Sequence, residues 1–259
     1  MKPYRFQYVF GPVSSWRLGR SLGIDPLSGI RKECNFNCIY CQLGETKKLR
    51  NRREVFAPTA KILKEISSFP NKNVDYYTFS SNGEPTLARN LGEIIAGIKK
   101  QKRGPVAVIT NAGLIHRKDV QKDLLSADLV MAKLDACSTN MFSLVNRPHQ
   151  EIELLHVIKG LKAFRKIFKG TLALQIMFVK ENKSFAVELA QMAKDINPDE
   201  IQINTPLRPC AVKPLTVQEI AEIKIKFNGL NVFCVYDGKK EKVEPFNKKD
   251  TAKRHGIVQ

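Results

Sequence analysis

Apolar residues along this chain alternate between short runs and longer stretches in which they recur every three or four positions. Short β-branched or aromatic runs are typical of buried strands, and the wider spacing is typical of helices. The short runs predict strands at 18–27, 74–80, 106–110, 129–134, 171–179, 200–204 and 232–236. The spaced positions predict helices at 59–69, 87–102, 116–126, 184–196 and 216–227, and a helical region that breaks at Pro148 and resumes over 154–164. The rest of residues 2–30 is predicted to be irregular.

The order of these elements is a β-α unit repeated about six times, which predicts parallel strands and right-handed crossovers. Six units fall short of the eight of a closed barrel, so we expect an α/β fold with an open, partial (β/α)6 barrel. Residues 1–259 are predicted to form one domain, with its core at about 18–236 and a basic tail at 239–259. Ser184 is predicted to cap one helix, and Thr216 with Glu219 to form a capping box at another.

Three of the six cysteines, Cys34, Cys38 and Cys41, lie within eight residues after the first predicted strand. Their spacing is one residue off the C-x2-C runs of zinc ribbons and bacterial ferredoxins. A structural zinc site needs four ligands, and the nearest histidine, His116, is far along the chain. The spacing therefore indicates an iron–sulfur cubane with three protein ligands and one iron left open. The carboxyl ends of barrel strands carry chemistry, and this loop follows one of them.

The amino-acid composition indicates which partners and which cellular compartment to expect. Forty-three Lys and Arg against 25 Asp and Glu give a net charge of +18, which favours polyanions such as RNA as partners. The alternative is a lysine-rich solvated surface, because the basic residues recur on every predicted helix. No apolar run of about 18 residues predicts a membrane span. The N-terminus lacks a signal-peptide pattern and the cysteine spacing suits metal better than disulfides, so a reducing cytoplasm is expected.

With Tyr40 just before the last cysteine, the loop resembles the signature of radical S-adenosylmethionine (SAM) enzymes. A second motif, Ser-Ser-Asn-Gly-Glu-Pro at 80–85, ends the second predicted strand, where those enzymes carry a Gly-Glu-Pro segment that holds the methionine amino group. Glu84 can accept from an ammonium group, and Gly83 lets the backbone approach a ligand closely. Alone, the segment is explained equally well as an Asn-Gly turn. The resemblance implies a partial six-unit barrel that binds one 4Fe–4S cluster through three cysteines, and SAM.

The same resemblance implies which residues contact the cofactor. They are Tyr40, Ser81, Asn82, Gly83, Glu84, Asn111, Lys133, Asp135, Gln175 and Asn204. Those at the later strand ends would contact the ribose, carboxylate and adenine, although each alone is also explained as a loop or turn residue. Cys137, Cys210 and Lys133 are candidates for substrate chemistry, with an inert thiol as the alternative for either cysteine. Cys234 is predicted to lie in the core.

Longer segments resemble the radical SAM group related to the wyosine-forming tRNA enzymes. They are 11–23, 38–44, 133–136 and 145–149. Archaeal members of that group carry further cysteines upstream of the signature for a second cluster, and no cysteine precedes Cys34 here. Wyosine synthesis itself is therefore not predicted, whereas the shared core chemistry is.

The sequence thus predicts an enzyme that cleaves SAM reductively and abstracts hydrogen from a substrate. One substrate class is RNA, most of all tRNA, bound by basic residues such as Lys47, Lys48, Arg50, Arg52 and Arg53. The other is a small metabolite or a peptide. A flavodoxin or ferredoxin is the expected electron donor, and no membrane is involved. A non-enzymatic alternative is an iron–sulfur electron carrier or a nucleic-acid-binding metalloprotein.

Overall fold

A computed structural model describes residues 6–27, 31–69, 74–238, 243–246, 248 and 251–252. Eight strands form a single sheet in the order in which they follow along the chain. They are β1 (Val9–Ser15), β2 (Gly19–Ile24), β3 (Tyr76–Phe79), β4 (Val106–Thr110), β5 (Leu129–Lys133), β6 (Thr171–Met177), β7 (Glu200–Asn204) and β8 (Val232–Cys234). Strand β1 is antiparallel to β2, and all later neighbours are parallel.

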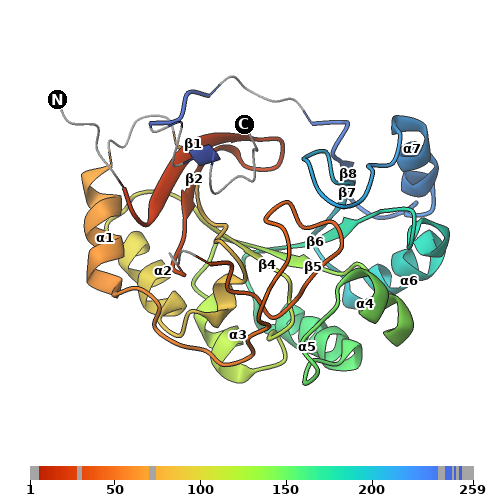
Figure 1. Ribbon diagram of the computed structural model, residues 1–259, viewed down its shortest axis with the longest axis horizontal. Helices are drawn as coiled ribbons and strands as arrows, with labels where there is room; N and C mark the ends of the chain where they lie inside the picture. The colour runs from red at the N-terminus through yellow and green to blue at the C-terminus, as the bar shows by residue number, and fades with distance from the viewer. Residues whose placement is uncertain are drawn as a thin grey trace.

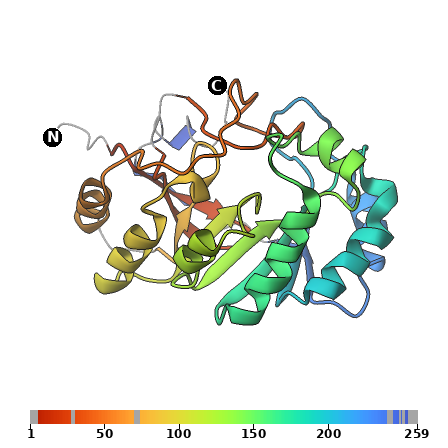
Figure 2. The same ribbon diagram turned by 90° about the horizontal axis from the view of Figure 1, so that it is seen from below.

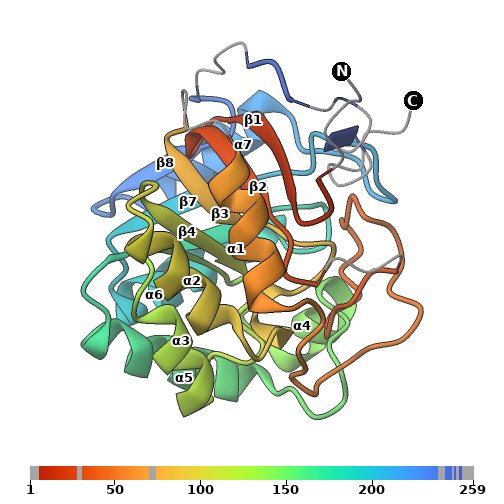
Figure 3. The same ribbon diagram turned by 90° about the vertical axis from the view of Figure 1, so that its left-hand side faces the viewer.

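Within the described ranges up to residue 238, seven α-helices follow the strands and lie outside the curled sheet, in an arc from α1 at the left of Figure 1 to α7 at its upper right. They are α1 (Thr59–Ser68), α2 (Leu91–Lys100), α3 (Lys118–Leu124), α4 (Thr139–Val145), α5 (Leu154–Ile167), α6 (Ala186–Ile196) and α7 (Val217–Ile225). Figure 3 shows α1, α2 and α3 side by side along the outside. The predicted partial barrel is confirmed, because β2 to β7 are each followed by a helical crossover.

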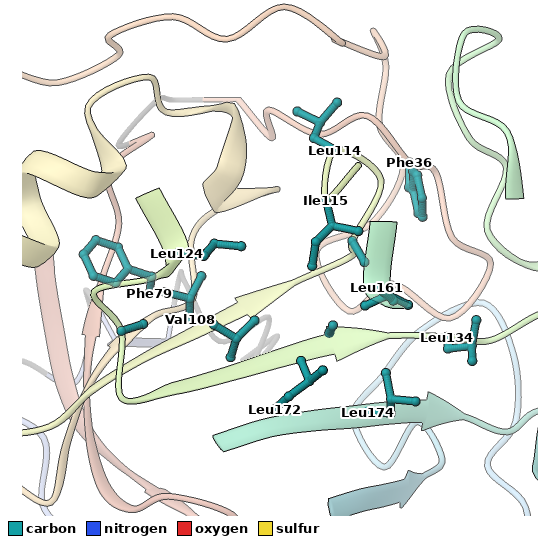
Figure 4. Close-up of a cluster of buried hydrophobic side chains, with 14 of the residues drawn as sticks. Phe36, Phe79, Val108, Leu114, Ile115, Leu124, Leu134, Leu161, Leu172 and Leu174 are labelled. Carbon is teal, nitrogen blue, oxygen red and sulfur yellow. The ribbon is translucent and has the colours of Figure 1, made fainter. Parts of the chain in front are cut away.

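Alternation along each strand separates two faces, because successive side chains of a strand point to opposite sides. On β6, Leu172 and Leu174 belong to the large core under the helices, which Figure 4 shows together with Leu134 and Leu161. Ala173, between them, belongs to a smaller cluster with Leu18, Ala107, Leu129 and Met131. That smaller cluster fills the amino-terminal part of the concave face, whereas polar side chains occupy its carboxyl end.

Three predictions about secondary structure were wrong in part. Residues 9–15, predicted to be irregular, form β1, because Gly11-Pro12 interrupts the apolar pattern while the strand shifts register between Phe10 and Val13. Helix 87–102 is split into a 3-10 turn, Pro85–Leu87, and α2. Helix α6 begins only at Ala186 after a 3-10 turn at Lys183–Phe185, so Ser184 does not cap it. The capping box of Thr216 and Glu219 is confirmed at α7.

The described part of the predicted tail packs against the first strand. The backbone N–H of Phe246 donates to the Gly11 carbonyl at 2.8 Å, and the Gly11 N–H donates to Thr251 Oγ1 at 3.1 Å. The Phe246 ring lies 5.2 Å from that of Phe69, centroid to centroid. Most of residues 239–259 lie outside the described residues, so the tail prediction is tested only there. Among the described helices, none has the length and apolar character that crossing a bilayer requires.

We expect Gly160→Ala to destabilise the fold although alanine favours helices. A Cβ at Gly160 of α5 would meet the backbone of Ile115 and His116, the latter with its nitrogen at 2.5 Å, so the helix would have to move off the β4–α3 loop. The expected loss is about 1–3 kcal/mol of unfolding free energy in urea. Gly97→Ala in α2 is the control, because the atoms it would meet are the end of the Leu63 side chain. Greater stability of Gly160→Ala than of the unsubstituted protein would contradict this packing.

Candidate metal and cofactor site

The cysteine loop, residues 33–41, has no helix or strand of its own and is held by backbone bonds to distant segments. On one side lies segment 145–149, between α4 and α5. The N–H of Asn37 donates to the carbonyls of Asn146 and Arg147 at 3.1 and 3.0 Å. The N–H of Ile39 donates to the Val145 carbonyl at 3.0 Å, and that of His149 to the Asn35 carbonyl at 2.7 Å. These bonds explain why the motif at 145–149 accompanies the cysteine signature.

On the other side, the loop is bonded to the segment that ends β3. The N–H of Glu33 donates to the Asn82 carbonyl at 3.0 Å, and the N–H of Glu84 donates to the Glu33 carbonyl at 2.9 Å. Gly83 lies between them with φ +143°, and a Cβ there would overlap the Glu33 carbonyl. Only glycine permits this approach. Figure 2 shows the orange segment that carries the cysteines running along one side of the molecule.

Each signature thiol has a nitrogen donor beside it. Asn111 Nδ2 lies 3.6 Å from Cys34 Sγ, Asn146 Nδ2 lies 3.7 Å from Cys38 Sγ, and Lys32 Nζ lies 3.1 Å from Cys41 Sγ. Such donors favour a thiolate, the form that binds iron.

Burial has the opposite effect on these thiols, because it disfavours the charged thiolate form. It is the main cause that raises the pKa of Cys38 to about 11, and it also raises the pKa of Cys34. Binding of a metal therefore has to displace protons from these thiols. The donor set fits a thiolate-ligated centre.

A single metal ion has no ready site in the described part of the chain. There, no three His, Cys, Asp or Glu side chains come together around one point. A polynuclear cluster is held by several thiolates on different irons, so it needs no such convergence. The absence of a fourth ligand, inferred from the sequence, is in keeping with this arrangement.

Glu84 is buried, and its carboxylate is engaged by four donors of the chain. Oε1 accepts from Thr86 N, Thr86 Oγ1 and Thr110 Oγ1 at 3.0, 2.7 and 2.6 Å, and Oε2 accepts from Asn111 N at 2.7 Å. Burial raises the pKa of Glu84, and these hydrogen bonds oppose the increase. The carboxylate thus joins the end of β3 to the end of β4. Since Oε2 has two lone pairs and accepts from only one of these donors, it retains capacity for one further donor.

A second polar cluster surrounds Asp135, after β5. Its buried carboxylate accepts from Tyr40 Oη in a short hydrogen bond, from Asn146 Nδ2 at 2.8 Å and from Met177 N at 2.7 Å. Lys133 Nζ lies 3.5 Å from this carboxylate, 3.4 Å from Gln175 Oε1 and 4.8 Å from the Tyr40 ring centroid. The structure thus brings together Tyr40 of the cysteine loop, Lys133 and Asp135 from the end of β5, and Gln175 of β6.

The other predicted site residues are placed as follows. Asn111 donates to Asn35 Oδ1 at 2.6 Å, and the buried Ser81 Oγ has no hydrogen-bond partner among the described residues. Asn204 Oδ1 accepts from the N–H of Thr205 at 2.9 Å, which is the turn role. Cys137 lies near Glu188 of α6, and Cys210 donates to the Val212 carbonyl at 3.2 Å. Cys234 lies in the core, as predicted.

Sequence reasoning missed three residues of the site, Lys32, Asn35 and Asn146. The signal for Asn146 was available, since it lies within the 145–149 motif. Lys32 and Asn35 stand in or beside the cysteine loop without a recognisable pattern.

The basic residues that follow the cysteine loop differ in their burial and in their partners. Arg53 is buried, where its guanidinium pairs with Asp119 at 2.8 Å and with Asp123, and donates to the carbonyls of Thr86 and Ala88. Its predicted contact with RNA is therefore wrong, because these partners occupy it. Arg50 pairs with Glu33. Lys47, Lys48 and Arg52 are exposed.

Comparison with known proteins agrees with this geometry. Residues 31–193 match the family model of the Radical SAM superfamily. The chain is 44% identical over 211 residues to the UPF0026 protein slr1464 of Synechocystis sp., across 81% of this chain and 78% of that protein.

Two solved structures share the fold. SuiB of Streptococcus suis bound to S-adenosylmethionine superposes with a TM-score of 0.64 at 15% identity, over 82% of this chain and 49% of that one. The chain thus spans about half the length of SuiB. Archaeal TYW1 superposes with a TM-score of 0.58 at 12% identity, over 86% of this chain and 75% of that one. At these identities, the two likenesses concern the fold alone.

We expect Gly83→Ala to bind less iron than the unsubstituted protein after anaerobic reconstitution, because the added methyl group pushes the cysteine loop off its backbone bonds. Gly44→Ala is the matched control. Gly44 also has a positive φ, +77°, but a Cβ there meets nothing within 4 Å. The control should lose only about 1–2 kcal/mol of stability from backbone strain and keep its iron. Equal iron content in both variants would show that the Glu33–Gly83 contact does not position the thiols.

Proposed function

Because the chain belongs to the radical SAM superfamily, we propose that it holds one 4Fe–4S cluster on Cys34, Cys38 and Cys41, cleaves SAM and abstracts hydrogen from a substrate. The family implies an iron–sulfur cluster and SAM. The observation that carries the finer proposal is a loop with three thiols, fixed by backbone bonds on both sides and lacking a fourth ligand. When bound and reduced, a cluster on these cysteines would supply the electron for reductive cleavage of SAM.

Residues around the loop have distinct proposed roles. Glu84 holds segment 81–85 against β4, with Oε2 available to the methionine ammonium group. The unpartnered Ser81 Oγ, with Asn82 and Gly83 beside it, offers a further polar contact on that segment. Asn111 holds Asn35 and reaches toward Cys34, which ties the end of β4 to the cluster loop.

The Asp135 cluster serves the other part of the cofactor. Asp135 accepts a hydrogen bond from the Tyr40 hydroxyl and so keeps the Tyr40 ring in place. Lys133 lies over that ring and contacts Gln175. We assign contacts to the ribose, adenine and carboxylate to this group and to Asn204. Since these side chains hold one another, they are set in position before a ligand arrives, which lowers the cost of binding.

RNA, most of all tRNA, is the proposed substrate. Lys47, Lys48 and Arg52 are exposed and follow the cysteine loop directly, so they stand beside the site in a chain of net charge +18. Neutralised phosphates release counterions, which gives such a surface affinity for any polyanion. A small metabolite or a peptide is the alternative substrate, in which case these side chains would be no more than a solvated surface.

The electron donor, a flavodoxin or ferredoxin, is proposed to approach through a hollow of about 540 Å³ beside the cysteine loop. Asn37, Leu49 and Arg147 line it together with the exposed Leu155. An apolar patch with a cation suits brief contact with an acidic redox protein. A reducing cytoplasm would keep the cysteines as thiols.

We expect Cys38→Ala to lose the cluster and with it the release of 5'-deoxyadenosine from SAM and dithionite under anaerobic conditions. Cys137→Ala and Cys210→Ala are the controls, because neither cysteine belongs to the proposed ligand set, and both should keep the cluster spectrum. Cleavage and substrate turnover unchanged in both controls would remove these two cysteines as candidates for substrate chemistry. An intact cluster spectrum in Cys38→Ala would contradict the assigned ligand set.

We expect the triple variant Lys47→Ala, Lys48→Ala, Arg52→Ala to bind tRNA with a shallower dependence on salt. Each lost phosphate contact should lower the slope of log affinity against log salt by about 0.7–0.9, so by roughly 2–3 for three contacts. The control carries Lys166→Ala, Lys169→Ala and Lys194→Ala, three exposed lysines at the amino-terminal end of the strands. Equal slopes for both triple variants would favour the small-molecule alternative.

A further inference from the structure

The β1–β2 hairpin turn, residues 16–18, reaches across the open side of the partial barrel. Leu18 packs on the concave face with Ala107 and Leu129. Trp16 lies against Gly238, just past β8, since a Cβ on that glycine would be 2.5 Å from Trp16 Cβ. The turn therefore extends from the β1 edge of the sheet to the residues that follow β8 at the other edge, and Arg17 stands in the middle of it.

Arg17 lacks the partner that a buried cation requires. Its Nε is buried and has no hydrogen-bond partner among the described residues. Its guanidinium carbon lies 5.3 Å from the ring centroid of its neighbour Trp16, which is a weak substitute for a carboxylate. Burying a charge without such a partner is costly, so proteins pair nearly all buried charges.

Other arginines of this chain follow that rule. Arg20, three residues further along the same hairpin, binds Asp75 with two side-chain hydrogen bonds at 2.7 and 3.1 Å. The buried Arg53 has two aspartates. Aspartates thus pair with Arg20 and Arg53, whereas Arg17 has no carboxylate partner among the described residues.

A second cation, Arg208, acts on Arg17 through its charge. Arg208, on the loop after β7, donates from Nη1 to Gln42 Oε1 at 3.0 Å, and Gln42 directly follows Cys41. Burial, with a smaller contribution from the Arg208 charge, lowers the pKa of Arg17 to about 10, and burial lowers the pKa of Arg208. Two cations held close together and away from water favour an anion between them.

We propose that Arg17 and Arg208 form an anion-binding pair that holds a carboxylate or phosphate group of the substrate inside the partial barrel. Guanidinium groups bind both oxyanions through paired N–H donors. The pair lies between the hairpin and the residue after Cys41, whereas segment 81–85 and Asn111 follow β3 and β4. This assignment deepens the proposed function and rests on it, since it gives the substrate, rather than SAM, an anchor beside the cysteine loop.

Trp16 is the single tryptophan of the chain, so its fluorescence reports on this hairpin turn. The reconstituted full chain is titrated anaerobically with inorganic phosphate and, separately, with malonate, at constant ionic strength and with and without saturating SAM. We expect a saturable change with at least one anion, and the tighter anion assigns the group as phosphate or carboxylate. Arg17→Gln and Arg208→Gln should each weaken binding about tenfold or more, whereas the exposed Arg52→Gln should not.

The proposal would be overturned if no anion gave a saturable response or if all variants responded equally. It would also be overturned if saturating SAM abolished the response, because the two arginines would then bind the cofactor. Thermal unfolding provides a second check, because Arg17→Gln removes an unpaired charge and should not lower the melting temperature, while Arg20→Gln breaks the pair with Asp75 and should. A larger decrease for Arg17→Gln would identify a structural arginine. Anion binding needs no cleavage of SAM, so this result stays separate from failure of the proposed chemistry.

Discussion

The backbone hydrogen bonds of the cysteine loop are the constraint on which the site depends. A loop without a helix or strand has N–H and carbonyl groups that need partners, and here segments 81–84 and 145–149 provide them from both sides. Gly83 and Arg147, both at positive φ, shape the two segments so that these bonds can form. Three thiols that are adjacent only in sequence thereby acquire fixed positions.

Parallel strands explain why the remaining polar groups gather at the same place. The carboxyl ends of β3 to β7 meet along one edge, so Glu84, Asn111, Lys133 and Asp135 become neighbours although they span some fifty residues of sequence. Asp135 and Glu84 then act as junctions, one joining β5 to Tyr40 and the other joining β3 to β4. The site is a network of side chains that position one another, with the loop on top.

The basic residues of this protein fall into three groups. Arg53 and Arg20 are parts of the fold, because each has aspartate partners that offset the cost of burial. Lys47 and Lys48 are exposed to solvent and available to polyanions. Arg17 belongs to neither group, since its Nε is buried and has no hydrogen-bond partner among the described residues. A net charge of +18 by itself does not distinguish these three cases.

The sequence by itself determined the repeated β-α order, most element positions and the cysteine signature, because periodicity and spacing are local properties. It also indicated the residues at the strand ends, since each directly follows an apolar run. Tertiary structure decided what lay beyond local pattern: that residues 9–15 pair as a strand across Gly11-Pro12, that Asn146 lies beside Cys38, and that Arg53 is occupied while Arg17 is not. Each of these depends on which distant group comes near, and that is set by the curvature of the sheet and the crossovers that build it.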